Sequence, residues 1–402
     1  MSLGQVFAQR VRWHRTRQGK SQAVVAGLAG LNAEYLGQIE RGYRVPSLDV
    51  VEAIAGALGV SVPELVAESS ERPSPAPDVL LASELHRALL LQQEASSGRS
   101  TDELQEAVEH AWRLWQGAAD RYSRLAAVVP DLIGDVATIN APGTTDPLLE
   151  HRVAADAYAL LRTVARRIGR PDLALVAADR ERRAAEQTED DVRLARANWN
   201  LAHALLGQQE PQTAEEIALA AIADIKGHGT REAAAISGAL WLAAAVAAAR
   251  SQRRFAAIER IRDHARPLAE KTGETNVGRT AFGPTNVALH MVSVELEDGH
   301  TADALAIADE IDPAPLQSRE RRTTLALDLA RSHAMRSDPG AALLHLLEAE
   351  QCSAEELRYN PTAHDTVRRV FQRARPSLRK QLTAFAQRVG IEDELAAGHT
   401  LS

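Results

Sequence analysis

The sequence predicts an all-α protein, and three observations support that prediction. Nearly a fifth of the 402 residues are alanine, while phenylalanine, tryptophan and tyrosine together make up only 4%. Alanine loses the least free energy on entering a helix, whereas strands favour β-branched and aromatic side chains. Glycine and proline turn signals also recur between alanine-rich stretches, which favours helices stacked side by side. A chain of this length is expected to contain two or three domains.

The distribution of charge divides the chain into a basic head and an acidic body. Residues 1–44 hold seven Lys and Arg against two Glu, a local balance of +5, so the formal net charge of −8 leaves −13 for the remainder. Prolines 73, 75 and 77 then disfavour helix and predict an extended linker. We therefore expect a head at 1–68, a linker at 69–79, a helical body at 80–390 and a tail at 391–402.

Several classes of protein are made improbable by the composition. The acidic total argues against a polybasic membrane binder, although a local basic patch remains possible. The single cysteine, Cys352, rules out an intramolecular disulfide and fits a reducing cytoplasm. The N-terminus lacks the apolar core of a signal peptide, so we expect a cytoplasmic protein. The alanine-rich stretch 233–249 is short for a membrane span, and we expect it to form a buried helix.

The head is predicted to form five short helices. The first runs from Leu3 to Gln18, and the last starts near Ser61 and continues through Ala67. Between them, Ser21 is a plausible N-cap for a second helix with Val24, Val25 and Leu28 as apolar positions, and Asn32 for a third over 33–41. The fourth is expected over 48–58. Two short helices around a glycine-containing turn are typical of a helix-turn-helix unit.

Residues 21–66 resemble the helix-turn-helix of the Xre family, the phage-repressor-type transcriptional regulators. The similarity rests on Ser21-Gln22, Ala26, Gly30, Tyr35-Leu36, the run 38–42 (QIERG), Pro46-Ser47, Ala55, Leu58-Gly59-Val60 and Leu65. The resemblance implies a structural ion pair between Arg15 and Glu40. Lys20 and His14 depart from the family pattern, and we expect them to soften the packing of the first helix.

In this family the third helix enters the major groove, which implies the candidate DNA contacts. Base edges would be read by four residues at its N-terminal end and one turn later, and phosphates would be contacted by three flanking residues. These are Asn32, Ala33, Glu34 and Gln38 for bases, and Gln22, Arg41 and Arg44 for phosphates. For Glu34 the alternative is an exposed or capping carboxylate, and for Arg44 it is a solvated loop charge.

The body contains a repeated turn signal. A short turn followed by alanine recurs at 168–174, 206–214, 250–256, 297–304 and 336–342, at intervals of 38 to 47 residues. Helix pairs at such periods resemble tetratricopeptide-like solenoids, in which small residues let neighbouring helices approach closely. Trp199 and Trp241 match the leading aromatic of that motif. We expect five to seven helix pairs, similar to the tetratricopeptide bodies that follow Xre-type heads in actinobacterial regulators.

One segment, residues 279–296, differs from the repeated pattern of the body. Asn286, His290, Ser293 and Glu297 recur along one face of an otherwise apolar helix. One interpretation is an effector pocket. The alternative is a solvated helix face beside a packed Phe282. The candidate effector-binding residues are Asn200, Trp241, Phe282, Asn286 and His290.

Signatures of catalysis are missing from the sequence. We find no phosphate loop, no zinc-binding histidine pair and no nucleophile elbow, so we expect no catalytic residues, no metal site, no cofactor and no enzymatic activity. Acidic pairs such as Glu215–Glu216 and Glu355–Glu356 are expected on the solvated surface.

Two functional hypotheses follow. The first is a transcription regulator that binds an inverted-repeat operator in double-stranded DNA as a homodimer, with the body sensing a small-molecule or peptide effector. The second is a protein-interaction scaffold in which the head is an accessory DNA-binding tether. The basic head and its recognition-helix pattern favour the first.

Overall fold

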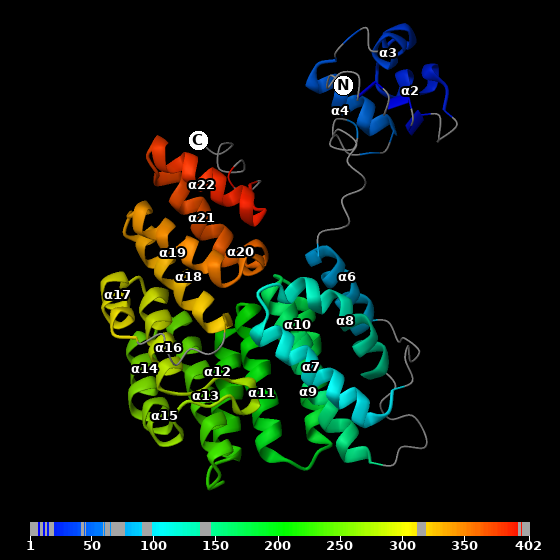
Figure 1. Ribbon diagram of the computed structural model, residues 1–402. Helices are drawn as coiled ribbons and strands as arrows, with labels where there is room; N and C mark the ends of the chain where they lie inside the picture. Colours follow the sequence, from blue (N-terminus) through cyan, green and yellow to red (C-terminus); the bar gives the residue numbers. More distant parts are fainter. Residues whose placement is uncertain are drawn as a thin grey trace. The chain divides into compact units, whose positions relative to one another are not determined.

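The computed structural model describes residues 7–8, 11–12, 14–15, 20–41, 44, 46–58, 60, 65, 77–90, 99–136, 146–311, 319–392 and 395. They belong to two compact units, residues 1–76 and residues 77–402 (Figure 1). Every regular element in these ranges is a helix, which confirms the predicted all-α class.

The head is built on three well-defined helices, α2 (Gln22–Leu28), α3 (Ala33–Glu40) and α4 (Leu48–Leu58). Both predicted caps are present: the Ser21 hydroxyl accepts from the Val24 N–H, and the Asn32 side-chain oxygen accepts from the Glu34 N–H at 2.8 Å. Gly30 adopts φ +67° in the turn between α2 and α3, where a side chain would be strained. The predicted helix-turn-helix is therefore confirmed.

The core of the head is formed by one face of each helix. Fully buried side chains include Val11, Val25, Leu36, Ile39 and Ile54. The described residues of the predicted first helix, 7–8, 11–12 and 14–15, are helical, and Leu65 is buried and helical in the predicted last one. The remaining residues of those two helices lie outside the described ranges.

One expectation for the head needs correction. Val24 and Leu28 are not core positions of α2, because they are 49% and 63% exposed; this short helix buries Val25 and Ala26 instead. The Nζ of Lys20, a residue that departs from the family pattern, donates to the Ala57 carbonyl at 3.0 Å. That carbonyl lies in the last turn of α4, where a cation is favoured by the helix dipole.

The body is a series of helix pairs (Figure 1). Its α-helices are α6 (Pro77–Leu90), α7 (Thr101–Gly117), α8 (Arg121–Val136), α9 (Pro147–Arg167), α10 (Pro171–Glu186), α11 (Asp191–Gly207), α12 (Pro211–Asp224), α13 (Arg231–Arg250), α14 (Arg254–Glu259), α15 (Arg266–Thr272), α16 (Pro284–Glu297), α17 (Thr301–Asp309), α18 (Arg319–Met335), α19 (Pro339–Cys352), α20 (Ala354–Tyr359), α21 (Pro361–Arg373) and α22 (Pro376–Val389). A π-helix, Arg260–Ala265, joins α14 to α15, and a short 3-10 turn, Val277–Arg279, precedes α16.

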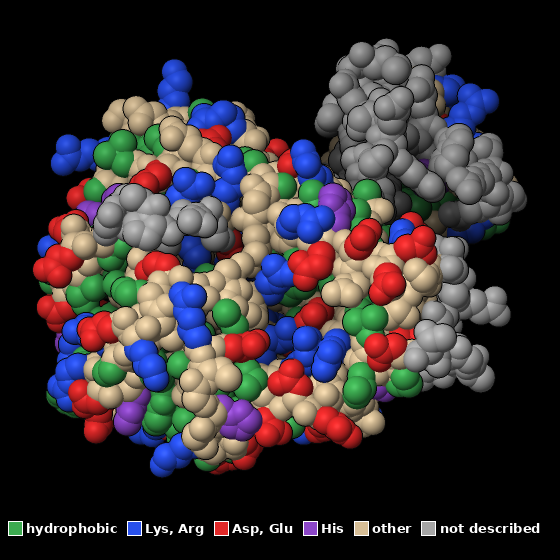
Figure 2. All heavy atoms as spheres, turned by 60° about the horizontal axis from the view of Figure 1, so that its bottom comes forward, with side chains coloured by type: hydrophobic (Ala, Val, Ile, Leu, Met, Phe, Trp, Pro, Cys, Tyr) green, Lys and Arg blue, Asp and Glu red, His purple; other side chains and the backbone are tan. Residues whose placement is uncertain are grey.

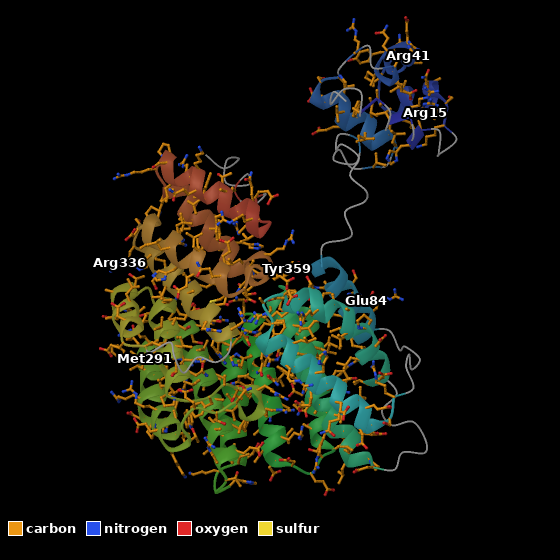
Figure 3. The ribbon with its side chains drawn as sticks, viewed as in Figure 1. Arg15, Arg41, Glu84, Met291, Arg336 and Tyr359 are labelled. Carbon is orange, nitrogen blue, oxygen red and sulfur yellow. The ribbon has the colours of Figure 1, made fainter. Side chains whose placement is uncertain are left out.

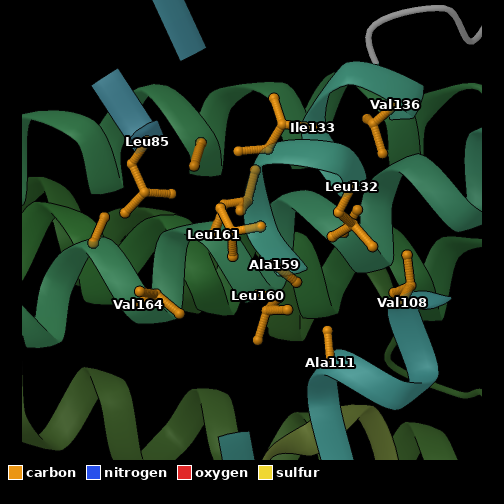
Figure 4. Packing of buried hydrophobic residues seen from close by; sticks show 14 of the residues in the cluster. Leu85, Val108, Ala111, Leu132, Ile133, Val136, Ala159, Leu160, Leu161 and Val164 are labelled. Carbon is orange, nitrogen blue, oxygen red and sulfur yellow. The ribbon is translucent and has the colours of Figure 1, made fainter. Parts of the chain in front are cut away.

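All five repeated turn signals connect helices that pack together. They join α9 to α10, α11 to α12, α13 to α14, α16 to α17 and α18 to α19. Figure 4 shows how apolar side chains from α6 to α9 fill the space between successive helices. The repeat therefore predicts the stacking of the body correctly.

Helix α13 illustrates why small residues are needed in the body. It is long and apolar enough to cross a membrane by length and composition, but 72% of its apolar window is buried against neighbouring helices. Gly238 on α13 receives the ring of Phe282, and a Cβ there would lie only 2.0 Å from the ring. As expected for 233–249, α13 is a buried helix of the body.

The predicted boundaries of the body differ slightly from the observed ones. Helix α6 begins at Pro77, inside the range predicted as linker, because proline is tolerated in the first turn of a helix. The rest of that linker lies outside the described residues. At the other end, Ile391 and Leu395 of the predicted tail are buried against the apolar core of the C-terminal helices.

The two ends of the body contact each other. Tyr122 at the start of α8 packs against Tyr359 of α20, with ring centroids 4.7 Å apart. Tyr359, labelled in Figure 3, belongs to the same apolar cluster as the residues of α6 to α9. Helix α7 also packs against α18. Because of these contacts, the first and last helix pairs of the body lie against each other. The first helix of each pair then faces a common interior.

Candidate DNA-binding face and body cavity

The predicted DNA contacts lie on α3, at its two ends and at the start of α2. Asn32, Glu34 and Arg41 are exposed at the start and end of α3, while Ala33 and Gln38 are half-buried. Arg44 is also exposed, and its guanidinium lies 6.0 Å from the centre of the Tyr35 ring. Helix α3 therefore presents polar side chains at its N-terminal end and arginines after its C-terminal end.

Two of these residues also have structural contacts. The Asn32 side-chain oxygen caps α3, which leaves its amide nitrogen as the donor for a base. The Gln22 Nε2 donates to a Glu40 carboxylate oxygen at 2.7 Å. Gln22 is thus held against the end of α3 before any DNA is present.

The ion pair implied by the family resemblance is confirmed. Arg15 Nε and Nη2 donate to the two carboxylate oxygens of Glu40 at 2.6 and 3.0 Å, and Nη1 donates to the Lys20 carbonyl at 3.0 Å. The hydrogen bond to Glu40 raises the pKa of Arg15. This pair ties the first helix to the end of α3 and fixes the orientation of α3. Arg15 and Arg41 are labelled in Figure 3.

The body contains a cavity of about 310 Å³ in its interior. The first helices of successive pairs supply its walls, and the turn at Gly278 and Arg279 also contributes. In Figure 2, blue Lys and Arg side chains surround the hollow near the middle of the body. The charged and polar residues lining it include Arg162, Arg166, Arg167, Arg196, Arg250, Arg279, Arg321 and Arg331, against Glu297, Glu320 and Asp328, with Gln116, Thr163, Asn200, His203, His290, Ser293, Thr324 and Thr362.

Most of the lining arginines have carboxylate partners. Arg167 donates to Glu320 at 2.6 Å and to Glu356 at 3.0 Å, and Arg279 pairs with Glu109. The other paired cations are Arg196 with Asp156 and Glu181, and Arg250 and Arg331 with Glu297. These five side chains hold the helices around the cavity in place.

The remaining three arginines, Arg162, Arg166 and Arg321, have no ion pair among the described residues. Burial lowers the pKa of Arg162 to about 10, although nearby Glu181 opposes the shift. Burial, together with the positive charges of Arg167 and Arg162, lowers the pKa of Arg166 to about 9. Among the described residues, Arg321 donates to the Thr280 carbonyl, at 3.0 Å, rather than to a carboxylate. The cavity is therefore positively charged, and the excess charge lies on α9 and α18.

The five candidate effector residues do not come together. Asn200 and His290 line the cavity, whereas Trp241, Phe282 and Asn286 are not among its lining residues. Phe282 is buried against Gly238, Trp241 stacks on His264 with centroids 3.9 Å apart, and Asn286 is buried within α16. The polar stripe of α16 faces the interior only through His290, Ser293 and Glu297.

The neutral state of His290 follows from its surroundings. Burial, together with the nearby charge of Arg321, lowers the pKa of His290 to about 4. Its Nδ1 lies 2.8 Å from the Asn286 carbonyl. His290 therefore adds no positive charge to the cavity near neutral pH.

Sequence reasoning missed the arginines of the cavity. Arg162 and Arg166 are one helical turn apart in α9, between apolar residues such as Leu161, Val164 and Ala165 that are fully buried. The available signal was three arginines, Arg162, Arg166 and Arg167, within the otherwise mostly apolar helical stretch 159–168. The contribution of Arg321 could not be anticipated in the same way, because α18 meets α9 only after the body closes.

The expectation that the paired acids are solvated was wrong for one residue of each pair. Glu356 is 1% exposed and accepts hydrogen bonds from Arg121, Tyr122, Arg167 and Asn360. Glu215 is buried between Arg253 and Arg260. Each joins helices that are distant in the sequence, which a local pattern does not reveal.

Within the described residues, one group of side chains has donor atoms close enough to hold a metal ion: Glu295, His300 and Asp303. The guanidinium of Arg254 already lies among them, 2.8 Å from Glu295 and 3.7 Å from Asp303. Because that positive charge opposes a cation, the group is better described as an ion-pair cluster.

Comparison with known proteins assigns the head. A family model described as a helix-turn-helix domain matches residues 6–68. The immunity repressor protein of Bacillus phage phi105 is 40% identical over 62 residues, covering 15% of this chain and 43% of that protein. The control protein C.SmaI of Serratia marcescens is 35% identical over 66 residues, covering 16% of this chain and 79% of that protein.

Two solved structures are similar to a larger part of the chain, but their TM-scores are low. The apo form of the competence regulator ComR from Streptococcus vestibularis has a TM-score of 0.32 and 12% identity, covering 97% of this chain and all of that one. Bacillus thuringiensis PlcR, solved with the peptide PapR7 and DNA, has a TM-score of 0.31 and 11% identity, covering 66% and 95%.

The match to the head is consistent with its geometry. The capped α2 and α3, the turn at Gly30 and the Arg15–Glu40 pair all fall within the matched residues. The match concerns a family of regulators rather than enzymes. Through its N-terminal domain, the chain belongs to the helix-turn-helix family of DNA-binding transcriptional regulators.

Proposed function

We propose that this chain is a cytoplasmic, sequence-specific regulator in which α3 reads the operator and the body responds to an effector. The observation that carries the proposal is the arrangement of α3. Its exposed Asn32 and Glu34 and half-buried Gln38 lie on a helix held by the Arg15–Glu40 pair, with Arg41 and Arg44 beyond its end.

The chemistry of these side chains suits a DNA duplex. Glutamine can make two hydrogen bonds to adenine, glutamate can accept from the cytosine amino group, and the alanine methyl can contact that of thymine. Arg41, Arg44 and Gln22 would contact phosphates, which position the head without reading sequence. A homodimer would place two copies of α3 in successive major grooves of an inverted repeat, about 34 Å apart.

The proposed role of the body is to sense an effector. A ligand that binds one conformation of the body better than another changes the population of that conformation and hence the affinity for the operator. The cavity supports this role over that of an open scaffold, because helices from both ends of the body line it, from Trp112 on α7 to Thr362 on α21.

Binding of the full chain to DNA from the vicinity of its own gene, followed by fluorescence anisotropy, tests this proposal. We expect the affinity to fall steeply with rising salt, because phosphate contacts release counterions. Gln38→Ala should weaken binding by about 1–3 kcal/mol. A matched control is Glu52→Ala, since Glu52 is exposed on α4 outside the predicted face. Salt-insensitive binding, or equal losses in both variants, would contradict the proposed docking.

A further inference from the structure

The cavity contains positive charge that the protein itself does not neutralise. Arg162 is only 4% exposed, and within the described residues its buried Nε has no hydrogen-bond partner. The Nε of Arg166, on the next turn of α9, is also buried and lacks such a partner, although the side chain as a whole is partly exposed. Arg321 is partly exposed too, and it faces a carbonyl rather than a carboxylate. Because desolvation disfavours a buried or partly buried guanidinium that has no ion pair, the protein gains from an anion that pairs with these three side chains.

The acids in the cavity wall are already engaged elsewhere. Glu320 pairs with Arg167, and Glu297 lies 3.8 Å from both Arg250 and Arg331. Asp328 accepts from the Ser293 hydroxyl at 3.2 Å. Among the described residues, none of these carboxylates forms an ion pair with the three arginines of α9 and α18.

We propose that the cavity binds a compact polyanion carrying carboxylate or phosphate groups, which pair with Arg162, Arg166 and Arg321. This inference rests on the sensing role proposed above for the body and gives the effector a chemical class. Guanidinium groups suit both kinds of oxyanion, because their parallel N–H donors bind two oxygens at once.

The other walls indicate what else the ligand carries. Within the part of the chain that the structure describes, the side-chain oxygen of Asn200, a residue only 2% exposed, has no hydrogen-bond partner, while its nitrogen donates to Glu181 at 2.8 Å. That oxygen is placed to accept from a ligand hydroxyl or amino group. The ring of Trp199 lies 5.5 Å from the Arg162 guanidinium, and Leu206, Val246 and Leu289 complete an apolar wall.

The size of the cavity favours a small molecule over a peptide. Its volume of about 310 Å³ is at the lower end of the range for small-molecule sites. An extended peptide advances about 3.3 Å per residue and would soon exceed such a space. We therefore expect a metabolite-sized organic anion.

Isothermal titration of the full chain with citrate and, separately, with pyrophosphate tests the proposal. Sodium chloride keeps the ionic strength constant. We expect saturable binding of at least one probe, with a Kd of roughly 1 mM or tighter. Binding of citrate alone indicates a carboxylate ligand, and binding of pyrophosphate alone indicates a phosphate ligand. Absence of saturable binding for both probes would overturn the proposal.

Two arginines that are adjacent in sequence provide an internal comparison. Arg166→Gln should weaken binding at least tenfold, or about 1.4 kcal/mol, and raise the melting temperature of the ligand-free protein, because it removes a partly buried charge that has no ion pair. Arg167→Gln should lower the melting temperature, because it leaves Glu320 without its ion-pair partner and removes one of the two arginines that pair with Glu356. Arg183→Gln, at an exposed position of α10, serves as the control and should change neither property.

The result for Arg166→Gln also separates this inference from the proposed regulator function. Unchanged probe binding in that variant would overturn the assigned site. If operator binding by the same preparations persists, the regulator function stands and only the ligand class is lost. If operator binding is also absent, the proposed function fails independently.

Discussion

Arginine serves different purposes in the head and in the body. In the head, Arg15 is fully engaged by Glu40 and the Lys20 carbonyl, and the pair holds the recognition helix in place. In the body, Arg121 and Arg167 form ion pairs with Glu356, but Arg162 and Arg166 on α9 form none with a carboxylate of the described residues. The paired arginines build the structure, whereas the unpaired ones remain available to a ligand.

The largest loss of stability is expected where the body closes. Glu356→Ala removes the partner of Arg121 and Arg167 and should lower the free energy of unfolding by about 3–5 kcal/mol, because it leaves buried charge uncompensated. Denaturant unfolding followed by tryptophan fluorescence measures the change. Glu350→Ala removes a partly exposed partner of Arg388 and should cost less than about 1 kcal/mol. Equal losses would mean that the closure does not stabilise the body.

A low pH should weaken the same contacts between the two ends of the body. Burial alone would raise the pKa of both Glu356 and Glu320. Arg121 and Arg167 instead hold the pKa of Glu356 at about 2. Arg167, with Arg121 and Arg321, holds the pKa of Glu320 at about 2. A depressed carboxyl pKa gives stability that is present above about 4.5 and is lost as the pH falls towards 2, by about 3 kcal/mol for each group.

Unfolding measured between pH 6 and pH 2 checks this dependence. In Glu356→Gln, whose side chain does not titrate, the decline should be about 3 kcal/mol shallower than in the wild type. Parallel pH profiles for the two proteins would contradict the assigned pKa of Glu356.

Breaking the ion pair of the head should have a smaller effect that is confined to the head. Glu40→Gln replaces the partner of Arg15 and should destabilise the head by about 2–3 kcal/mol. Hydrogen exchange of the α2 and α3 amides should accelerate, while exchange in α9 to α13 should not change. Glu52→Gln on the exposed side of α4 is the control. Faster exchange in both units would indicate that they do not unfold independently.

Two glycines compare the packing of the units. Gly238→Ala places a Cβ 2.0 Å from the Phe282 ring, and we expect a loss of about 1–3 kcal/mol in the body. Gly56→Ala on α4 meets nothing within 4 Å and should stabilise the head by about 0.5–1 kcal/mol. Melting temperatures of the two variants should therefore shift in opposite directions. A neutral Gly238→Ala would show that α13 tolerates repacking.

Local signals predicted much of this molecule. Ser21 and Asn32 cap helices through contacts two or three residues away, and the repeated turns depend on a few adjacent residues. The cavity is different, because its charge arises when α9 and α18 meet after the chain returns to α7 and α8. The burial of Glu356 has the same origin. For the charge of the cavity, the one local indication in the sequence was the presence of Arg162 and Arg166 in a mostly apolar helix.

The central claim, that α3 gives this chain its sequence preference for DNA, is tested most directly by selecting binding sites from a random DNA pool with the wild type and with Gln38→Ala. We expect the wild type to enrich an inverted repeat with half-sites about 34 Å apart, and Gln38→Ala to lose the preference at one base of each half-site. Failure to enrich any sequence, or enrichment of the same sequence with equal preference by both proteins, would contradict it.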